Sequence, residues 1–271
     1  MNGHDQEDTG YYELDAAMHL RRVDDPKAHA WMKEKVAIPQ NVLSVDAASV
    51  LYVDDKGKRW RLPRGDTAFD EVIKRGEART DREVVTERDL FNCHGTFYEL
   101  PAENAGGFTK IRPITTHNRR ITDYCSYRGL LVLTGMERGE VARTNRHIIR
   151  SDDNKAAVWV GAVDDLWQMG KARGHGGPCK DTPLQANVPS DPYLMTGYDR
   201  KVLTLSHSAP GPVTMRVEVD ITGSGQWMPY RSFPVTAGTT TQHEFPAAFQ
   251  AYWVRVVADQ DCSATAQLRY E

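Results

Sequence analysis

Residues 212–221 read PVTMRVEVDI, a stretch in which apolar and polar side chains alternate. Alternation with a period of two is typical of a β-strand that has one face in a core and the other in solvent. The positions predicted to face the core are Met215, Val217, Val219 and Ile221. The pattern therefore predicts a strand of an antiparallel sheet with one buried face.

Further stretches around this one repeat the alternation, and Gly- and Pro-containing turns separate them. They are KVLTLSH (201–207), WMPYRSFPV (227–235), TTQHEFP (240–246), YWVRVVAD (252–259) and ATAQLRY (264–270). In YWVRVVAD the expected core positions are Trp253 or Tyr252, then Val254 and Val256. Short strands joined in this way are typical of a β-sandwich, which we predict over residues 196–271.

The preceding region, residues 42–195, also alternates short strands with turns. Strands over Ser49–Val53 and Lys58–Leu62, joined by a turn over Asp54–Gly57, predict a β-hairpin. After a polar, helix-compatible stretch to residue 82, more strands are expected at 95–101, 110–116, 130–135, 147–151 and 156–163. The glycine-rich residues 170–192 are predicted to form a long loop, and loops of such length are often functional.

Residues 1–41 form an N-terminal segment that contains the clearest helix signal of the chain. In residues 24–36, DDPKAHAWMKEKV, Asp24 or Asp25 can cap the helix and Pro26 suits its first turn. The predicted fold class is thus mainly β, with one N-terminal helix, propeller-like antiparallel hairpins over 42–195 and the sandwich over 196–271.

The propeller prediction depends on spacing and on one turn motif. Strand hairpins recur about every 35–45 residues, as in propeller blades. Asp55-x-Gly57-x-x-Trp60 resembles the Asp box of sialidase-like propellers, although Val53 and Arg59 replace the Ser and Thr of that motif. LYVDDKGKRWRLP, GTFYELP and AVWVGAVDDLW share an aromatic-rich strand followed by a turn. The chain therefore resembles the C-terminal portion of a β-propeller carbohydrate-active protein with an appended β-sandwich.

Residues 42–195 hold only about three or four blades, at or below the lower end of the four to eight that usually close a propeller. The sequence thus predicts either that the chain belongs to a longer protein or that another copy completes the blades. An incomplete array leaves an open sheet edge, and open edges pair unless they are protected. We therefore expect either self-association or an edge covered by the helix at 24–36.

Composition excludes several classes of function. The 271 residues carry a formal net charge of -3, so no excess of positive charge predicts nucleic-acid binding. No apolar run approaches the roughly 20 residues of a membrane span. The acidic start MNGHDQEDTG lacks the features of a secretory signal, which leaves the localisation open between the cytoplasm and a mature or truncated form.

The four cysteines have no CxxC spacing, so a structural zinc site is not expected. Cys93 and Cys125 each lie close to a predicted strand, and the sequence leaves open whether they form a disulfide. The P-loop, GxSxG and HExxH patterns are absent. No cofactor and no metal are therefore predicted.

Functional signals concentrate in residues 93–129, where polar planar groups and aromatic rings flank three predicted strands. Aromatic faces pack on pyranose rings, while Arg, Asn and Asp side chains bind hydroxyls, so this mixture suits a sugar site. The predicted substrate-binding residues here are His94, His117, Asn118, Arg119, Arg120, Tyr124 and Arg128. Asp123 is the candidate catalytic carboxylate of the segment. The alternative is that these Arg residues are solvated and the His residues satisfy backbone groups.

A second signal is VDDLW at 163–167, at the end of a predicted strand. Asp164 or Asp165 can supply another catalytic carboxylate, although neighbouring strand residues face opposite sides, so only one should face a site. Trp167 and His175 complete the predicted substrate-binding residues. The alternative is a capped turn, in which Asp is common.

Three hypotheses follow from these residues. The first is a glycoside hydrolase in which Asp123 and Asp164 or Asp165 form the carboxylate pair and His117 and Arg128 orient a glycan substrate. The second is a non-catalytic carbohydrate-binding or interaction module that uses the same residues. The third is a structural protein whose sandwich mediates assembly. We favour the first, with a glycan as ligand, no nucleic acid or membrane as partner, and possible self-association.

Overall fold

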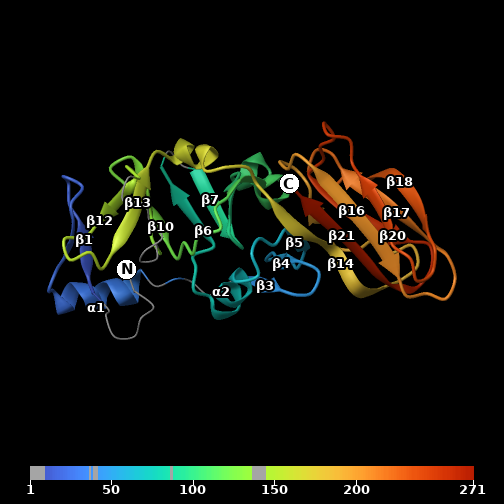
Figure 1. Cartoon of the computed structure of the whole chain (residues 1–271), viewed down its shortest axis with the longest axis horizontal. Coiled ribbons are helices and arrows are strands. Elements are labelled where there is room, and N and C mark those ends of the chain that lie inside the picture. Colours follow the sequence, from blue (N-terminus) through green and yellow to red (C-terminus); the bar gives the residue numbers. More distant parts are fainter. Residues whose placement is uncertain (1–9, 37, 39–41, 86–87, 136–144) are drawn as a thin grey trace.

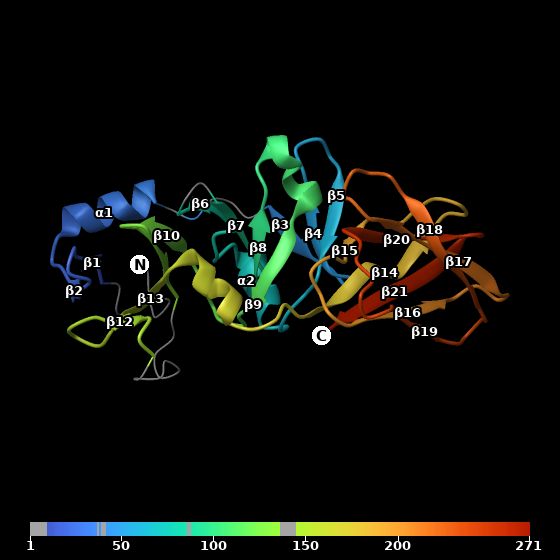
Figure 2. The same cartoon turned by 90° about the horizontal axis from the view of Figure 1, so that it is seen from above.

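The computed structural model describes residues 10–36, 38, 42–85, 88–135 and 145–271. The fold is mainly β, as predicted, and its sheets follow one another along the long axis of the molecule (Figure 1). The hairpin of β1 (Tyr12–Leu14) and β2 (Leu20–Arg22) and helix α1 (Pro26–Lys35) lie at one end, and the β-sandwich lies at the other (Figure 2).

Two packed sheets form the sandwich. The first has the strand order β14 (Gly174–Leu184), β21 (Cys262–Tyr270), β16 (Lys201–His207) and β19 (Thr241–Glu244). The second begins with β18 (Met228–Val235), β17 (Val213–Asp220) and β20 (Trp253–Ala258). The predicted strands after residue 196 are therefore confirmed, and Met215, Val217, Val219, Val254 and Val256 lie in the shared core.

Two of the predicted core positions are wrong. Ile221 is 46% exposed because β17 ends at Asp220, whose carboxylate accepts the N–H groups of Gly223 (2.9 Å) and Gly225 (2.7 Å) and turns the chain. Trp253 is buried, but on the opposite face of β20 from Val254, as alternation along a strand requires. Tyr252 also packs on that second core rather than on the sandwich core.

The second sheet of the sandwich extends into the middle region. From β20 it continues through β15 (Tyr193–Leu194), β5 (Arg59–Leu62), β4 (Val50–Val53) and β3 (Leu43–Val45). Trp253 lies at this junction, 4.5 Å from the ring of Trp60, and its Nε1–H donates to the Thr109 carbonyl at 2.7 Å. The division into segments 1–41, 42–195 and 196–271 stays a prediction. Both sheets of the sandwich include strands from before residue 196, so the predicted boundary between residues 195 and 196 does not separate two sets of sheets.

The glycine-rich segment is a strand in the structure, so the prediction of a long loop over 170–192 is wrong. β14 pairs with β21 from Gly174↔Tyr270 to Leu184↔Cys262, with bulges near Cys179. A Cβ at Gly177 would lie only 1.9 Å from the Ala266 carbonyl oxygen. Glycine is thus present because two backbones approach closely, not because the segment is mobile.

Two four-stranded antiparallel sheets occupy the middle of the molecule. One is a meander of β6 (Asp81–Val84), β7 (Arg88–Cys93), β8 (Thr96–Leu100) and β9 (Arg112–Thr116). The other has the order β10 (Tyr124–Tyr127), β11 (Leu130–Leu133), β13 (Ala157–Gly161) and β12 (Ile148–Arg150). Among the described residues these sheets do not close into a ring.

Equivalent turns connect strands of these two sheets. His94 (φ 50) and Gly95 (φ 80) join β7 to β8, and Arg128 (φ 52) and Gly129 (φ 79) join β10 to β11. Positive φ at both central residues is the type I′ geometry of tight hairpins, for which X-Gly sequences are preferred. The two sheets therefore share a hairpin design.

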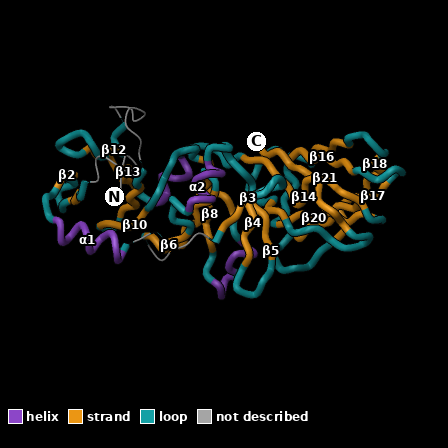
Figure 3. The backbone as a smooth tube through the Cα atoms, turned by 90° about the horizontal axis from the view of Figure 1, so that it is seen from below, coloured by secondary structure: helices purple, strands orange, loops and turns teal. Residues whose placement is uncertain are grey.

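Helices are short and lie at the margins of the sheets (Figure 3). At the N-terminal end, β1 (Tyr12–Leu14) pairs with β2 (Leu20–Arg22). The predicted helix is confirmed as α1 (Pro26–Lys35), with Asp25 as the N-cap that accepts the Ala28 N–H at 2.9 Å. Elsewhere lie α2 (Phe69–Arg75), η1 (Glu103–Ala105), η2 (Gly107–Lys110) and η3 (Val163–Gln168). In the described part of the chain, no helix has the length and apolar character to cross a membrane.

The hairpin turn that resembles an Asp box is held by Asp54 rather than by Asp55. Asp54 Oδ1 accepts the N–H groups of Lys56 (3.0 Å) and Lys58 (2.8 Å), and the Trp60 Nε1–H donates to Oδ2 at 3.2 Å. Gly57 takes the left-handed position of the turn at φ 77. The turn is therefore a carboxylate-capped hairpin in which Gly57 and Trp60 keep their expected roles.

Candidate functional site

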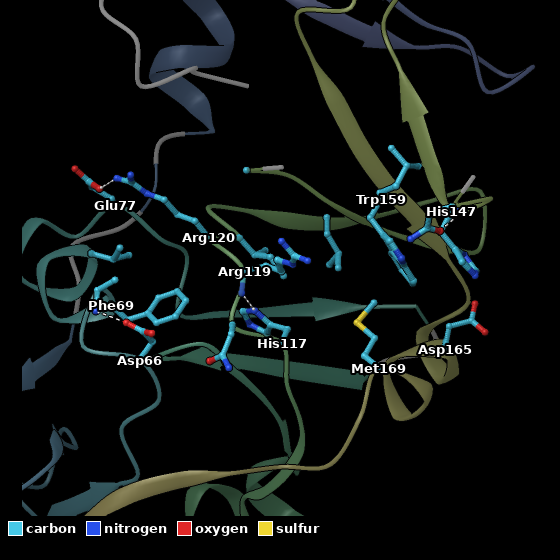
Figure 4. Close-up of a pocket in the computed structure, with 18 of the residues that line it drawn as sticks. Asp66, Phe69, Glu77, His117, Arg119, Arg120, His147, Trp159, Asp165 and Met169 are labelled. Atoms are coloured by element: carbon cyan, nitrogen blue, oxygen red, sulfur yellow. Dashed lines mark hydrogen bonds and ion pairs between the residues drawn. The ribbon is translucent and has the colours of Figure 1, made fainter. Parts of the chain in front are cut away.

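A pocket of about 880 Å³ lies between helix α2 and the second middle sheet (Figure 4). One wall is α2 with the residues around it, and the opposite wall is β12, β13 and η3. The loop from His117 to Ile121, which joins the two middle sheets, lies between these walls. The pocket thus forms where three separate segments of the chain meet.

Residues next to the two ends of α2 fix where this wall of the pocket begins and ends. Asp66 Oδ1 accepts the Ala68 N–H at 2.8 Å just before α2, and Gly76 ends the helix in the left-handed conformation (φ 63). Phe69 is buried, while Glu71 and Arg75 project from the same helix and line the pocket. The wall therefore offers an aromatic edge between charged groups.

His117 is the half-buried polar centre of the connecting loop. Its ring lies 4.9 Å from Phe97 and 6.5 Å from Phe69. Nδ1 accepts the Arg119 N–H at 2.9 Å, and Nε2 lies 3.3 Å from Asn92 Oδ1, to which it can donate. Burial lowers the pKa of His117 to about 3, because the ring has little water to solvate a charge. His117 is therefore a neutral imidazole at physiological pH.

Ion pairs neutralise much of the charge at the mouth of the pocket. Arg120 bonds Glu77 through Nη2, and Arg75 lies 3.6 Å from the same carboxylate. Arg119 and Asn118 are exposed and line the pocket beside them. The opposing charges therefore leave a polar rather than a strongly anionic or cationic rim.

The opposite wall carries an aromatic pair. His147 stacks on Trp159 with centroids 5.0 Å apart and an interplanar angle of 17°. His147 Nδ1 donates to the Val160 carbonyl at 3.0 Å, which leaves Nε2 as an acceptor. A Cβ at Gly161 would lie 2.4 Å from the Trp159 ring and 2.8 Å from Asp165 Oδ2. The missing side chain of Gly161 therefore lets the indole and the carboxylate share one corner.

The structure brings five of the predicted site residues together at this pocket. They are His117, Asn118, Arg119, Arg120 and Asp165. Asp165 also caps η3, since its Oδ2 accepts the Ala162 N–H at 2.8 Å. The sequence predicts that His117, Arg119 or Arg120, Asp123, Arg128 and one of Asp164 and Asp165 line one concave surface. Asp123 and Arg128 are not among the residues that line this pocket.

The other two carboxylates do not line the pocket. Asp123 accepts a hydrogen bond from Arg79 Nε at 2.6 Å and lies 3.5 Å from Arg82. Asp164 is exposed and binds Arg88 at 2.7 Å. The three predicted carboxylates therefore lie in three different places. Asp123 is in a partly buried ion pair, Asp164 is in a surface ion pair, and Asp165 lines the pocket.

The remaining predicted residues have structural or surface positions. Tyr124 is fully buried and its hydroxyl donates to the Leu90 carbonyl at 2.8 Å. Arg128 forms a hairpin turn, and Trp167 is 46% exposed with Arg88 above its ring at 5.9 Å. His175 is an exposed residue of β14. His94 is buried and bonds the segment before α2, so it supports the pocket without lining it.

Several lining residues were not predicted from the sequence, namely Asp66, Phe69, Glu77, His147, Trp159 and Gln168. The register Ile148↔Trp159 places His147 beside Trp159, and the predicted strands at 147–151 and 156–163 contained this signal. No sequence pattern predicts that Glu77 lines the pocket, because the position of Glu77 depends on how α2 packs against the rest of the protein.

No group of three or more His, Cys, Asp or Glu side chains suited to a metal ion occurs among the described residues. The four cysteines, which all lie in described parts of the chain, are free thiols. Burial raises the pKa of the Cys93 and Cys179 thiols, so neither is a reactive thiolate.

Comparison with known proteins identifies no relative. No protein family matches the sequence, and no curated protein matches it. A structural search returns a crystal structure of PirA, with 14% identity over 36% of this chain and 84% of that chain, at a TM-score of 0.22. It also returns RmlC from Streptococcus suis in complex with dTDP-D-xylose, with 14% identity, 53% and 65% coverage and a TM-score of 0.16. Such low TM-scores carry no argument about fold or function.

Proposed function

We propose that the chain binds a carbohydrate in the pocket between α2 and the β12–β13 wall. The observation that carries this proposal is the lining itself, an open volume of about 880 Å³ that combines a stacked aromatic pair with planar hydrogen-bonding groups. Sugar rings present apolar C–H faces and a rim of hydroxyls, and this lining offers partners for both.

The polar partners of the pocket suit neutral hydroxyl groups better than a charged ligand. Arg120 and Glu77 already pair with each other, and an ion pair can still accept or donate further hydrogen bonds. His147, Asn118 and Gln168 add further donors and acceptors at the rim. We therefore favour a neutral glycan over a phosphorylated or sulfated ligand.

Binding is better supported than hydrolysis. Glycosidases need two carboxyl groups about 5–10 Å apart across the scissile bond, and at least one must be available to protonate the leaving group. Here Glu77 is bonded to Arg120, Asp165 and Asp66 accept backbone N–H groups, and Asp123 is bonded to Arg79. Hydrolysis by Asp123 with Asp164 or Asp165 stays a prediction, to be tested by turnover of the D123N variant.

We also propose that the two middle sheets are blades of a propeller that this chain does not complete. Their antiparallel four-stranded build and their equivalent His94-Gly95 and Arg128-Gly129 turns support this. The proposal predicts that the free edges of these sheets pair with further strands in the complete assembly.

A glycan array tests the proposed function, with three variants as reporters. H147A and Q168A remove pocket groups, whereas W167A removes a neighbouring exposed aromatic residue that does not line the pocket. We expect the wild type and W167A to retain the same glycans and H147A and Q168A to lose at least tenfold in affinity. Absence of any bound glycan, or equal losses in W167A, would contradict the proposal.

A further inference from the structure

His94 fastens the wall of the pocket to the rigid β7–β8 hairpin. The Gly65 N–H donates to His94 Nδ1 at 2.9 Å, so Nδ1 carries no proton. The proton is then on Nε2, which donates to Asp70 Oδ1 at 2.7 Å. The other carboxylate oxygen of Asp70 binds Arg64. One neutral imidazole thus joins the backbone before α2 to a side chain within α2.

Backbone packing shows how closely the two segments fit. A Cβ at Gly65 would lie 2.5 Å from the His94 carbonyl oxygen, and a Cβ at Gly95 would lie 2.8 Å from the Phe69 ring. The His94 side chain is completely buried, and its φ of 50 fixes it in the hairpin turn. The clamp therefore places the first turn of α2 within narrow limits.

The clamped segment carries much of the pocket wall. Asp66, Phe69, Val72 and Arg75 line the pocket and follow Gly65 directly in the chain. His94 itself is not in the lining. A change in the clamp would therefore alter the pocket without removing any group that touches a ligand.

Protonation of His94 is incompatible with this clamp. A cationic imidazole has a proton on both nitrogens, so Nδ1 would face the Gly65 N–H donor to donor. Burial lowers the pKa of His94, and Asp70 opposes that effect, so the proton arrives below the ordinary value of 6.5.

Other titratable or charged groups surround the His94 ring and its partners. Asp70 lies in α2 and Arg64 lies just before it, while Cys93 is in the same hairpin as His94. Arg119 and Arg120 border a small cavity that His94 also lines. His117 contacts Phe69 from the loop after β9, and the backbone of His175 in β14 pairs with that of Arg64. Of these groups, only Asp70 and the Gly65 N–H bond the imidazole.

We propose that His94 is the positioning residue of the pocket and that its protonation releases the α2 wall, so that the pocket loses its glycan on acidification. This inference rests on the proposed function for its ligand, but the clamp itself can be measured without one. The conservative variant is H94N, because Asn favours the left-handed turn and its Oδ1 replaces Nδ1 as an acceptor that does not titrate.

Hydrogen exchange measures the clamp directly. We expect the protection factors of the wild-type 64–76 peptide to fall between pH 7.5 and 4.5, approaching tenfold per pH unit below pH 6.5, where His94 of the released wall takes up a proton and His94 of the closed clamp does not. In H94N the fall should be smaller, because the His94 contribution is lost and only the acid destabilisation due to His117 remains. In H175N, which removes a nearby exposed histidine, the protection should fall as in the wild type. A pH-independent wild-type peptide, or an equal fall in H94N, would overturn the clamp.

The glycan array, repeated at pH 7.5 and pH 4.5, tests the regulation. Glycans retained by the wild type at pH 7.5 should bind more weakly at pH 4.5, and the loss should be smaller in H94N. Equal binding by the wild type at both values would overturn the regulation even where exchange supports the clamp. No binding at pH 7.5 would overturn the proposed function instead, and the clamp would then be judged by exchange alone.

Discussion

His117 makes the stability of the protein depend on pH in a direction that the structure fixes. Its pKa is lowered from 6.5 to about 3 by burial between Phe97 and Phe69. In the unfolded chain His117 takes up a proton below pH 6.5, whereas in the folded chain His117 stays neutral until about pH 3. Acidification through this window therefore favours the unfolded state, and the stability that neutral His117 contributes is lost as the pH falls.

The magnitude follows from the free energy of one pKa unit, about 1.4 kcal/mol. Between pH 6.5 and pH 4.5 the wild type should lose about 2–3 kcal/mol through His117, with the lower figure allowing for partial solvation of the ring. The H117N variant keeps an acceptor for the Arg119 N–H but has no titrating group. Its loss over the same window should be smaller by this amount.

Urea unfolding at a series of pH values, followed by tryptophan fluorescence, gives the two stability curves. At pH 7.5 we expect H117N to be the less stable protein, since it lacks the ring that packs on Phe97. The difference should shrink as the pH falls and approach zero near pH 4.5. A difference that stays constant from pH 7.5 to pH 4.5 would refute the assignment of a buried neutral imidazole.

Three further predictions concern the fold. G177A should destabilise the sandwich by about 2–3 kcal/mol because its Cβ would collide with the Ala266 carbonyl, whereas G211A, where a Cβ meets nothing, should change thermal stability little. D123N should lower the free energy of unfolding in urea by about 1.5–3 kcal/mol, because it weakens the bond to the buried Arg79. D164N, at an exposed ion pair, should lower it by less than about 0.5 kcal/mol, and equal effects of the two variants would contradict the burial argument. An incomplete set of blades predicts either self-association or an edge covered by the helix at 24–36, and a monomer mass by light scattering at every concentration together with an uncovered edge would contradict this.

The sandwich was predictable because each of its strands carries its own evidence. The alternation in Met215, Val217 and Val219 is a property of neighbouring residues and needs no knowledge of the partner strand. The predictions are wrong where the conformation of a segment depends on residues that pack against it. Gly177 belongs to a strand only because β21 approaches it, and its composition alone resembles a loop. Ile221 continues the alternation in sequence, but the carboxylate of Asp220 ends the strand.

The candidate site was predictable only in part, for a related reason. Residues 117–120 and Asp165 follow predicted strands, so their clustering at strand ends could be expected. Phe69 belongs to α2 and Glu77 follows its C-terminal Gly76, and the position of this helix depends on the His94 clamp rather than on any local pattern. Asp123 has the residue type of a catalytic group, but its pairing with Arg79 arises from packing across 44 positions of sequence.

The central claim is that a carbohydrate occupies the pocket, and a hydrogen-exchange footprint of a bound glycan tests it most directly. The protein would be exchanged at pH 7.5 with and without a glycan selected from the array. We predict added protection in three segments that line the pocket, residues 66–77, 117–121 and 159–169, and no change in the sandwich strands β16 to β19. Protection confined to the sandwich, or absent from all three segments in the presence of saturating glycan, would contradict the claim.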